Sequence, residues 1–330
     1  MDGERFEPPR WLANPHLQSL IAGSPPRRAW IRRGARALLA ASREHLLDCG
    51  EGVRLQGFHA GADGRHLVLL LHGWEGSADA QYVLSAASYL FARGFDVFRL
   101  NLRDHGATHH LNPELFHSCR LAEAIGAVRA VRGLWPAQPL SLVGYSLGGN
   151  FALRIAAQAR AAGLELRQVV AICPVLDPAH TLAAIEAAPR IYREYFVLKW
   201  RNSLRRKHRA WPDRYRLEEL LAGRDLTDMT ELLVLRHGGF PDLASYLNGY
   251  AIVGPVLEGL EVPSRVIAAL DDPIIPAADL GRLARPRALT VTPEAHGGHC
   301  GFLESLGGPT WADRQVYATL AAAHGLAAAR

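Results

Sequence analysis

The sequence has no apolar run long enough to cross a bilayer, no Cys-x-x-Cys pair and only four cysteines. A membrane-spanning helix needs about 18 or more consecutive apolar residues, so none is expected. The first residues, MDGERFEPPRWLANPHLQ, lack the apolar segment of a secretory signal. Because Cys49, Cys119, Cys173 and Cys300 are far apart and follow no such signal, we expect free thiols. These absences predict a cytoplasmic protein.

The charge of the chain is only mildly unbalanced. Lysine and arginine number 37 against 32 acidic residues, which gives a net charge of +5. The excess is concentrated in residues 27–36 and 199–209, but no nucleic-acid motif or aromatic stacking pattern accompanies either stretch. We therefore predict no nucleic-acid partner and interpret both stretches mainly as solvated helix faces. At most, we expect weak, salt-sensitive attraction of 199–209 to anionic lipid surfaces.

What the sequence does contain is a regular alternation of apolar strands and helical patterns. Hydrophobic residues make up 49% of the 330 positions, which is enough for a large core. Short apolar strands are predicted at 66–71, 96–102, 140–144, 169–173, 265–270 and 288–292. Helical patterns lie between them, for example at 80–94 and 120–135. Such alternation forms right-handed βαβ units around a parallel sheet, so the predicted fold class is α/β.

One interval interrupts this alternation. The residues between the strands at 169–173 and 265–270 have mainly helical character and far exceed a normal crossover connection. We interpret approximately 177–260 as a helical cap inserted into the α/β fold. No repeat, low-complexity tract or flexible linker divides the chain, so residues 1–330 are predicted to form a single domain that carries this cap.

The stretch LSLVGYSLGGNFALRI, residues 140–155, runs from a buried strand into a helix through a very tight turn. Gly144, Ser146 and Gly148 form the pattern G-x-S-x-G. In such a turn, small flanking residues allow the serine to occupy a strained corner with its hydroxyl above the sheet. The pattern alone occurs often by chance, so its neighbours in the predicted sheet decide its meaning.

The loops that follow the other strands supply residues suited to work with this serine. Residues 72–76, HGWEG, could turn the backbone N–H of Trp74 toward a developing oxyanion, and Leu147 supplies a second N–H. An aspartate pair begins the loop 271–276, and two histidines lie in the loop 296–299. The order serine, aspartate, histidine matches the chain order of an α/β-hydrolase triad.

The chain resembles the α/β hydrolases, and within them the YheT-like branch related to the abhydrolase-domain lipid esterases. The resemblance is carried in order by WLANPHLQSL, LLLHGWEGS, GYSLGGN, ALDDPIIP and HGGHCGF. It implies hydrolysis of carboxylic esters without a cofactor, with Ser146 as nucleophile, His299 as general base and Asp272 orienting the histidine. The stretch NLRDHGATHH, residues 101–110, departs from the usual turn of that branch.

Each of the two loops offers two candidates for its role, so one aspartate and one histidine have to be selected. We select Asp272 over Asp271 because Pro273 and Pro276 stiffen the loop that follows it, and we expect Asp271 to point to the other face. We select His299 over His296 because Gly297 and Gly298 give the chain freedom to bring the imidazole over the serine. His296 is expected to support the loop through hydrogen bonds.

Three other functions remain open at this point. Asp104, His105, His109 and His110 could bind zinc, which would make the protein a metallohydrolase. The hydrolase scaffold could serve only as a binding module, although a binding protein has no need of a serine, a histidine and an aspartate in this order. The same acyl-enzyme could pass its acyl group to an alcohol, which would make the protein an acyltransferase. We favour the esterase and predict no metal or other cofactor, and the sequence indicates no oligomeric state.

Overall fold

A computed structural model describes residues 4–61, 66–215 and 217–326. Its centre is an eight-stranded sheet in the order β1-β2-β4-β3-β5-β6-β7-β8. The strands from β4 to β8 in this order pair in parallel, whereas β1 and β2 pair antiparallel at one edge. The bounds are β1 Arg43–Asp48, β2 Arg54–Ala60, β3 Leu67–Leu71, β4 Asp96–Leu100, β5 Leu140–Tyr145, β6 Leu166–Ile172, β7 Ser264–Ala269 and β8 Leu289–Glu294.

The six strands predicted from the sequence are confirmed, with ends that shift by a few residues. The strands β1 and β2 were not predicted. Strand β1 exposes most of its residues, and Arg54, Gln56 and His59 interrupt the apolar residues of β2. Neither strand therefore has the continuous apolar run that identifies a strand buried on both faces. These two edge strands extend the sheet away from the loops that carry the candidate site.

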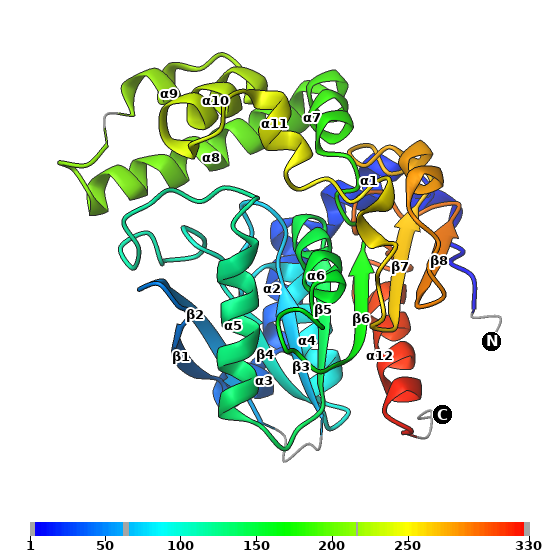
Figure 1. Cartoon of the computed structure of the whole chain (residues 1–330). Helices are drawn as coiled ribbons and strands as arrows, with labels where there is room; N and C mark the ends of the chain where they lie inside the picture. The colour runs from blue at the N-terminus through cyan, green and yellow to red at the C-terminus, as the bar shows by residue number, and fades with distance from the viewer. Residues whose placement is uncertain (1–3, 62–65, 216, 327–330) are drawn as a thin grey trace.

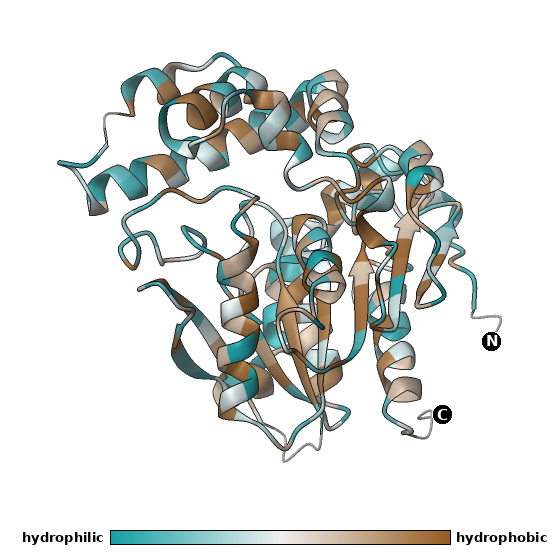
Figure 2. Cartoon of the chain, in the orientation of Figure 1, coloured by the Kyte–Doolittle hydropathy of each residue, from teal (hydrophilic) through white to brown (hydrophobic). Residues whose placement is uncertain are grey.

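Helices cover both faces of the sheet (Figure 1). Alternate side chains of β3 enter different cores, with Leu69 and Leu71 in one and Val68 and Leu70 in the other. The first core includes α5 Leu121–Leu134 and α6 Leu147–Ala157, and the second includes α2 Pro25–Gly34, α3 Arg36–Ala41, α4 Gln81–Phe91 and α12 Trp311–Ala323. Figure 2 shows the apolar residues concentrated in the central strands between these helical layers.

The N-terminal residues form η1 Arg10–Leu12 and α1 Pro15–Ala22, which lie near the ends of β7 and β8 in Figure 1. Helix α1 begins where the Asn14 side chain accepts hydrogen bonds from the amides of His16 and Leu17 at 2.9 and 3.1 Å. This cap satisfies amides that a helix start leaves unpaired. Gln18 of α1 bonds to the Leu303 main chain, which places this helix beside the loop that follows β8.

A helical insertion follows β6, as predicted, and lies above the carboxyl edge of the sheet (Figure 1). It contains α7 Pro178–Ala187, α8 Arg190–Ala210, α9 Glu218–Ala222, α10 Leu226–Leu233, η2 Val234–Gly238 and α11 Leu243–Asn248. The short helices η3 Pro255–Leu257 and η4 Ala277–Arg282 flank β7. Trp200 and Leu204 of α8 are buried in the core cluster that also contains α5 and α6. That the cap and the sheet form a single domain stays a prediction.

The helices of this fold are short or polar. Even α8, the longest at 21 residues, carries many charged side chains. Across the described residues, the structure has no helix whose length and apolar character would let it span a bilayer.

Candidate active site

Ser146 lies at the corner between β5 and α6 in a strained backbone conformation, with φ 52° and ψ −120°. A non-glycine residue in such a region costs on the order of 1–3 kcal/mol, so the surrounding structure must enforce it. A Cβ on Gly144 would overlap the Gly148 backbone, and a Cβ on Gly148 would overlap the carbonyl of Leu71. The two glycines of the G-x-S-x-G pattern are therefore required for β5, α6 and β3 to approach closely.

His299 and Asp272 lie next to this serine. The Ser146 Oγ is 3.0 Å from His299 Nε2, and His299 Nδ1 is 2.8 Å from Asp272 Oδ2. The Asp272 side chain is only 1% exposed, and its Oδ1 accepts hydrogen bonds from the amides of Ile274 and Ile275. Two amides and an imidazole thus satisfy a buried carboxylate. The structure brings the three residues singled out in the sequence into one hydrogen-bonded chain.

Asp271 and His296, the aspartate and the histidine that were not selected, form a separate contact. His296 Nδ1 is 3.2 Å from Asp271 Oδ2, and the Gly298 amide donates to Asp271 Oδ1 at 2.9 Å. Asp271 therefore contacts the histidine loop and does not turn away from it as the sequence suggested. His296 supports this loop, as expected, and its side chain is 46% exposed.

The stretch WLANPHLQSL carries two supporting residues that sequence reasoning did not assign. Ser19 Oγ accepts a hydrogen bond from the His299 amide at 2.9 Å and donates to the Pro15 carbonyl at 2.8 Å. Gln18 is fully buried, and its amide group exchanges hydrogen bonds with the Leu303 main chain at 3.0 and 2.7 Å. The only signal for these roles was the resemblance of this stretch to its family. Helix α1 thus holds the histidine loop at His299 and the following segment at Leu303.

The loop 72–76 follows β3 and is held by its own side chains. His72 Nδ1 donates to the Gly73 carbonyl at 2.7 Å, and its Nε2 accepts from the Leu102 amide at 3.1 Å. The Gly73 amide donates to the Tyr82 hydroxyl at 2.9 Å. Burial keeps the pKa of His72 well below its usual range, so the ring is neutral with a defined tautomer.

The Trp74 amide belongs to the same peptide group as the Gly73 carbonyl. In a planar trans peptide the N–H points opposite to the C=O, so the bond from His72 also orients the Trp74 N–H. Trp74 and Leu147 line the same cavity as Ser146 and His299. The assignment of both amides to an oxyanion hole stays a prediction.

That cavity has a volume of about 530 Å³ and lies between the cap and the carboxyl edge of the sheet. Ser146 and His299 line it together with residues of α1, α2, α7, α8, α10 and α11. The Trp74 ring stacks on Phe196 with centroids 5.5 Å apart and meets Trp200 edge-on at 5.3 Å. The cap contribution is mainly apolar, for example Leu182, Ile185, Tyr192, Phe196, Leu226, Leu233 and Leu247. Its size and lining suit a small molecule with a large apolar part.

Three of the four residues considered for a zinc site, Asp104, His105 and His109, are engaged in other bonds, and His110 is exposed. Asp104 Oδ1 accepts from Lys207 Nζ at 2.7 Å, and His109 Nε2 lies 2.9 Å from Ser203 Oγ. His105 donates through Nδ1 to the Arg103 carbonyl. Within the described ranges these side chains do not meet as a group of metal ligands, so the geometry gives the metallohydrolase no support.

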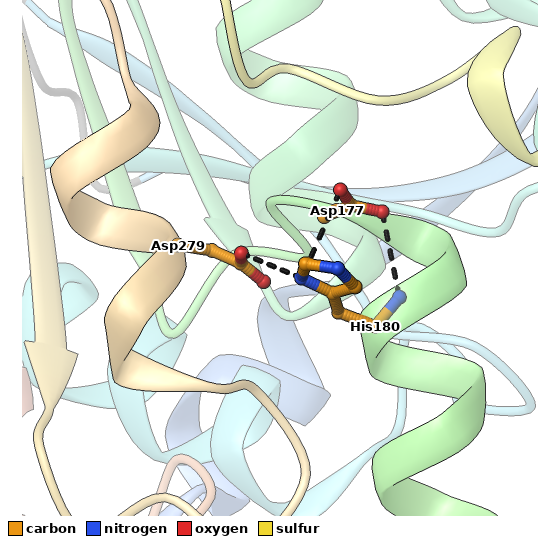
Figure 3. Close-up of side chains that lie close together, drawn as sticks. All are labelled: Asp177, His180 and Asp279. Atoms are coloured by element: carbon orange, nitrogen blue, oxygen red, sulfur yellow. Dashed lines mark hydrogen bonds and ion pairs between the residues drawn. The ribbon is translucent and has the colours of Figure 1, made fainter.

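A different trio, Asp177, His180 and Asp279, does bring its ligand atoms within 4.8 Å of one another (Figure 3). His180 Nδ1 is 2.7 Å from Asp279 Oδ1. A cationic side chain already lies among them, because Arg282 Nη1 is 2.6 Å from Asp177 Oδ2 and 2.9 Å from Asp279 Oδ1. We therefore interpret the trio with Arg282 as an ion-pair cluster that joins the start of the cap to η4.

The basic stretch 199–209 is only in part the solvated face predicted from the sequence. Lys207 is fully buried, and Lys199 Nζ donates to the Glu75 carbonyl at 2.8 Å. Arg201 donates to the Gly223 carbonyl within the cap. A run of basic letters does not reveal which side chains of a helix turn inward. The remaining exposed arginines leave a smaller cationic surface than the sequence indicated.

The four cysteines are free thiols, as predicted. Cys300, the residue after His299, lines the cavity. Burial raises its pKa well above the usual range, which favours the unreactive thiol over the thiolate. The Cys300 thiol is therefore not a second candidate nucleophile beside the histidine.

Two relatives align with most of the chain. YheT of Escherichia coli (strain K12), named as a candidate esterase, is 26% identical over 307 residues, which cover 90% of this chain and 87% of that protein. The monoacylglycerol lipase ABHD2 of Bos taurus is 24% identical over 276 residues, which cover 76% of this chain and 64% of that protein.

Solved structures share the fold at lower identity. A bacterial membrane phospholipase A superposes with a TM-score of 0.59 at 17% identity, covering 90% of this chain and 91% of that one. A Pyrococcus furiosus esterase superposes with a TM-score of 0.56 at 14% identity, covering 91% of each chain. The family model described as the alpha/beta hydrolase fold matches residues 66–306, which span β3 to the loop after His299. The chain therefore belongs to the α/β-hydrolase family.

Proposed function

We propose that this α/β hydrolase is a serine esterase that cleaves carboxylic esters through an acyl-enzyme on Ser146. The observation that carries the proposal is the hydrogen-bonded chain from Ser146 Oγ to His299 and on to Asp272, at 3.0 and 2.8 Å. A serine hydroxyl is a weak nucleophile until a base accepts its proton, and this geometry offers that base.

In the first step, His299 Nε2 accepts the proton of Ser146 while Oγ attacks the ester carbonyl carbon. Asp272 accepts the Nδ1–H bond, which keeps the Nε2 lone pair directed at the serine and stabilises the imidazolium that forms. His299 then donates its proton to the leaving alcohol as the tetrahedral intermediate collapses to the acyl-enzyme. A water molecule, activated by the same histidine, releases the acid and regenerates Ser146.

The negative charge on the carbonyl oxygen would be stabilised by the amides of Trp74 and Leu147. Leu147 is the first residue of α6, where the unpaired amides and the helix dipole favour an anion. The Trp74 amide is oriented by the bond from His72 to the Gly73 carbonyl. Removing one such donor typically costs about 3 kcal/mol of transition-state stabilisation.

The lining of the cavity supports esters with a large apolar part as substrates. Side chains of α7, α8 and α10 provide a mainly apolar wall around Ser146. A methylene group moved from water to such a wall contributes about 0.8 kcal/mol. We therefore infer a preference for acyl groups longer than acetyl, which agrees with the lipase and phospholipase names among the relatives.

The test is steady-state turnover of p-nitrophenyl esters of graded acyl length by purified protein. Ser146→Ala should abolish turnover, whereas Ser88→Ala, on α4 and outside the cavity, should leave it unchanged. Rates should rise from acetyl to medium-length acyl groups. Full turnover by Ser146→Ala would refute the proposal. Adding alcohols to the assay distinguishes an esterase from an acyltransferase. An acyltransferase would form a new ester from the added alcohol faster than it releases the free acid.

A further inference from the structure

We propose that Lys199 and His105 are positioning residues that hold the main chain of Glu75 from two sides and thereby fix the neighbouring Trp74 amide. The inference rests on the proposed esterase function, since it assigns these residues to the oxyanion hole of that reaction. It gives a role to the NLRDHGATHH stretch and to the cap helix α8, neither of which the triad uses.

Glu75 has the backbone conformation that requires such support. Its φ is 54°, in the left-handed region that a non-glycine residue adopts only at a cost of about 1 kcal/mol or more. The Glu75 amide donates to His105 Nε2 at 3.1 Å, and the Glu75 carbonyl accepts from Lys199 Nζ at 2.8 Å. One residue is therefore held by the sheet side through its N–H and by the cap side through its C=O.

His105 is built to accept this hydrogen bond. Its Nδ1 donates to the Arg103 carbonyl at 2.7 Å, so the neutral ring presents the lone pair of Nε2 to Glu75. Burial lowers the pKa of His105 to about 4, which keeps the ring neutral at physiological pH. Phe116 packs edge-on against the ring at 4.7 Å, and His72 lies at the same distance on another side. The orientation of the imidazole is thus fixed by packing and by hydrogen bonding.

Lys199 provides the contact from the cap. It is one of only two lysines in the sequence, and the other, Lys207, also lies on α8 and is bonded to the core. The Lys199 ammonium donates to the Glu75 carbonyl at 2.8 Å and lies 5.0 Å from the centre of the Tyr195 ring. Burial raises the pKa of the Glu75 carboxyl to about 7, and the charge of Lys199 acts in the opposite direction. A compact ammonium on a flexible stem suits a single carbonyl better than the broad fork of an arginine.

The aromatic neighbours of Lys199 strengthen the same link. Phe196 and Trp200, three residues before and one residue after Lys199, pack on the Trp74 ring at 5.5 and 5.3 Å. One turn of α8 therefore holds both the side chain of Trp74 and the main chain of the next residue. His72 fixes the peptide before Trp74, and His105 fixes the peptide after it. The direction of the Trp74 N–H thus depends on the cap being seated on the loop.

The experiment compares Lys199→Met with Lys199→Arg, His105→Gln and the control Arg205→Met, an exposed residue on the same helix. Circular dichroism checks folding, and kcat and KM are measured on one uncharged p-nitrophenyl ester. We expect Lys199→Met to lower kcat by about 10- to 100-fold and to change KM by less than about twofold. This loss of kcat is smaller than that expected for removing an entire oxyanion-hole donor. Lys199→Arg retains a donor, so its kcat should lie between those of Lys199→Met and the parent. His105→Gln should lower kcat as Lys199→Met does. Arg205→Met should have the kcat and KM of the parent.

A spectroscopic measurement separates positioning from a general loss of stability. Lysine labelled with ¹³C at Cε gives two side-chain signals in this chain, because the sequence contains only Lys199 and Lys207. Attachment of a phosphonate to Ser146 should shift the Lys199 signal, identified by its absence in Lys199→Arg, more than the Lys207 signal. Because Lys199 lines the same cavity as Ser146, the shift supports positioning only together with the loss of kcat in Lys199→Met.

The outcomes are distinguishable. If the parent protein neither reacts with fluorophosphonate nor hydrolyses esters, the proposed function itself fails, and the positioning inference fails with it. If the parent is active and folded Lys199→Met retains full kcat, only the positioning inference is overturned. A loss confined to KM, and only for esters that carry a negative charge, also overturns it, because Lys199 would then contact substrate directly.

Discussion

Replacing Lys207 with methionine tests how the cap helix is fastened to the core. The Lys207 ammonium is fully buried and donates to Asp104 Oδ1, the Asn112 carbonyl and the Glu114 carbonyl, each at 2.7 Å. All three protons of the ammonium are therefore used. Methionine has a similar length and keeps the packing of the stem, but it removes every one of these bonds.

The expected loss follows from what remains. The Asp104 side chain is 6% exposed and keeps the Phe116 amide, at 2.9 Å, as a donor. Breaking a buried ion pair by removing one partner typically costs about 3–5 kcal/mol. Burial already raises the pKa of Asp104 to about 6, with Lys207 acting in the opposite direction, so the variant can protonate this carboxyl. Protonation limits the penalty, and we expect the free energy of unfolding to fall by about 3 kcal/mol.

Urea denaturation followed by tryptophan fluorescence measures this free energy in the parent, Lys207→Met, Asp104→Asn and the double variant. The double variant should lose at least about 1 kcal/mol less than the sum of the single changes, because the two side chains contact each other. Arg205→Met, on the exposed side of the same helix, should change stability by less than about 0.5 kcal/mol. A loss below about 1 kcal/mol for Lys207→Met, or additive single effects, would refute the reasoning.

Three further outcomes follow from the structure. Asp272→Asn should lower kcat by about 10⁴-fold through the wrong histidine tautomer, whereas Asp271→Asn should lower it far less; the reverse order on one activated ester would exchange their roles. Gly148→Ala should destabilise the protein by more than about 2 kcal/mol or prevent its folding, because a Cβ would overlap the Leu71 carbonyl. A urea midpoint equal to that of the parent would contradict this expectation. Because burial lowers the pKa of His105 to about 4, the unfolded state binds a proton first as the pH falls below about 6.5. This group therefore removes about 2 kcal/mol of stability between pH 7 and pH 5, and the stability of His105→Gln should fall less steeply over that range in urea melts.

The parts of this structure that the sequence predicted are those specified by local pattern. Leu67 to Leu71 form a continuous apolar run because both faces of β3 are covered, and such runs identify central strands. The positions of Ser146, Asp272 and His299 followed from a second regularity, since the carboxyl ends of parallel strands meet at one edge. The close contact of these three side chains could therefore be anticipated.

What the sequence did not reveal depends on rotation about an element or on contacts between distant segments. Lys199 and Lys207 belong to a strongly basic stretch, and only the packing of α8 shows that both turn inward. His105 was a candidate metal ligand because a histidine beside an aspartate is a common pair of zinc ligands. Its bond to the Glu75 amide joins residues 30 positions apart, which the local sequence does not indicate. Ser19 contacts the His299 amide across 280 positions, which no local pattern records.

The most direct test of the account is the site at which a fluorophosphonate becomes attached. Purified protein is treated with the reagent, digested, and the modified peptide is sequenced by mass spectrometry, with Ser146→Ala treated in parallel. The account predicts one phosphonate per chain on Ser146, loss of ester turnover in proportion to labelling, and no labelling of Ser146→Ala. Stoichiometric attachment to another residue, or ester turnover that persists after Ser146 is fully labelled, would contradict it.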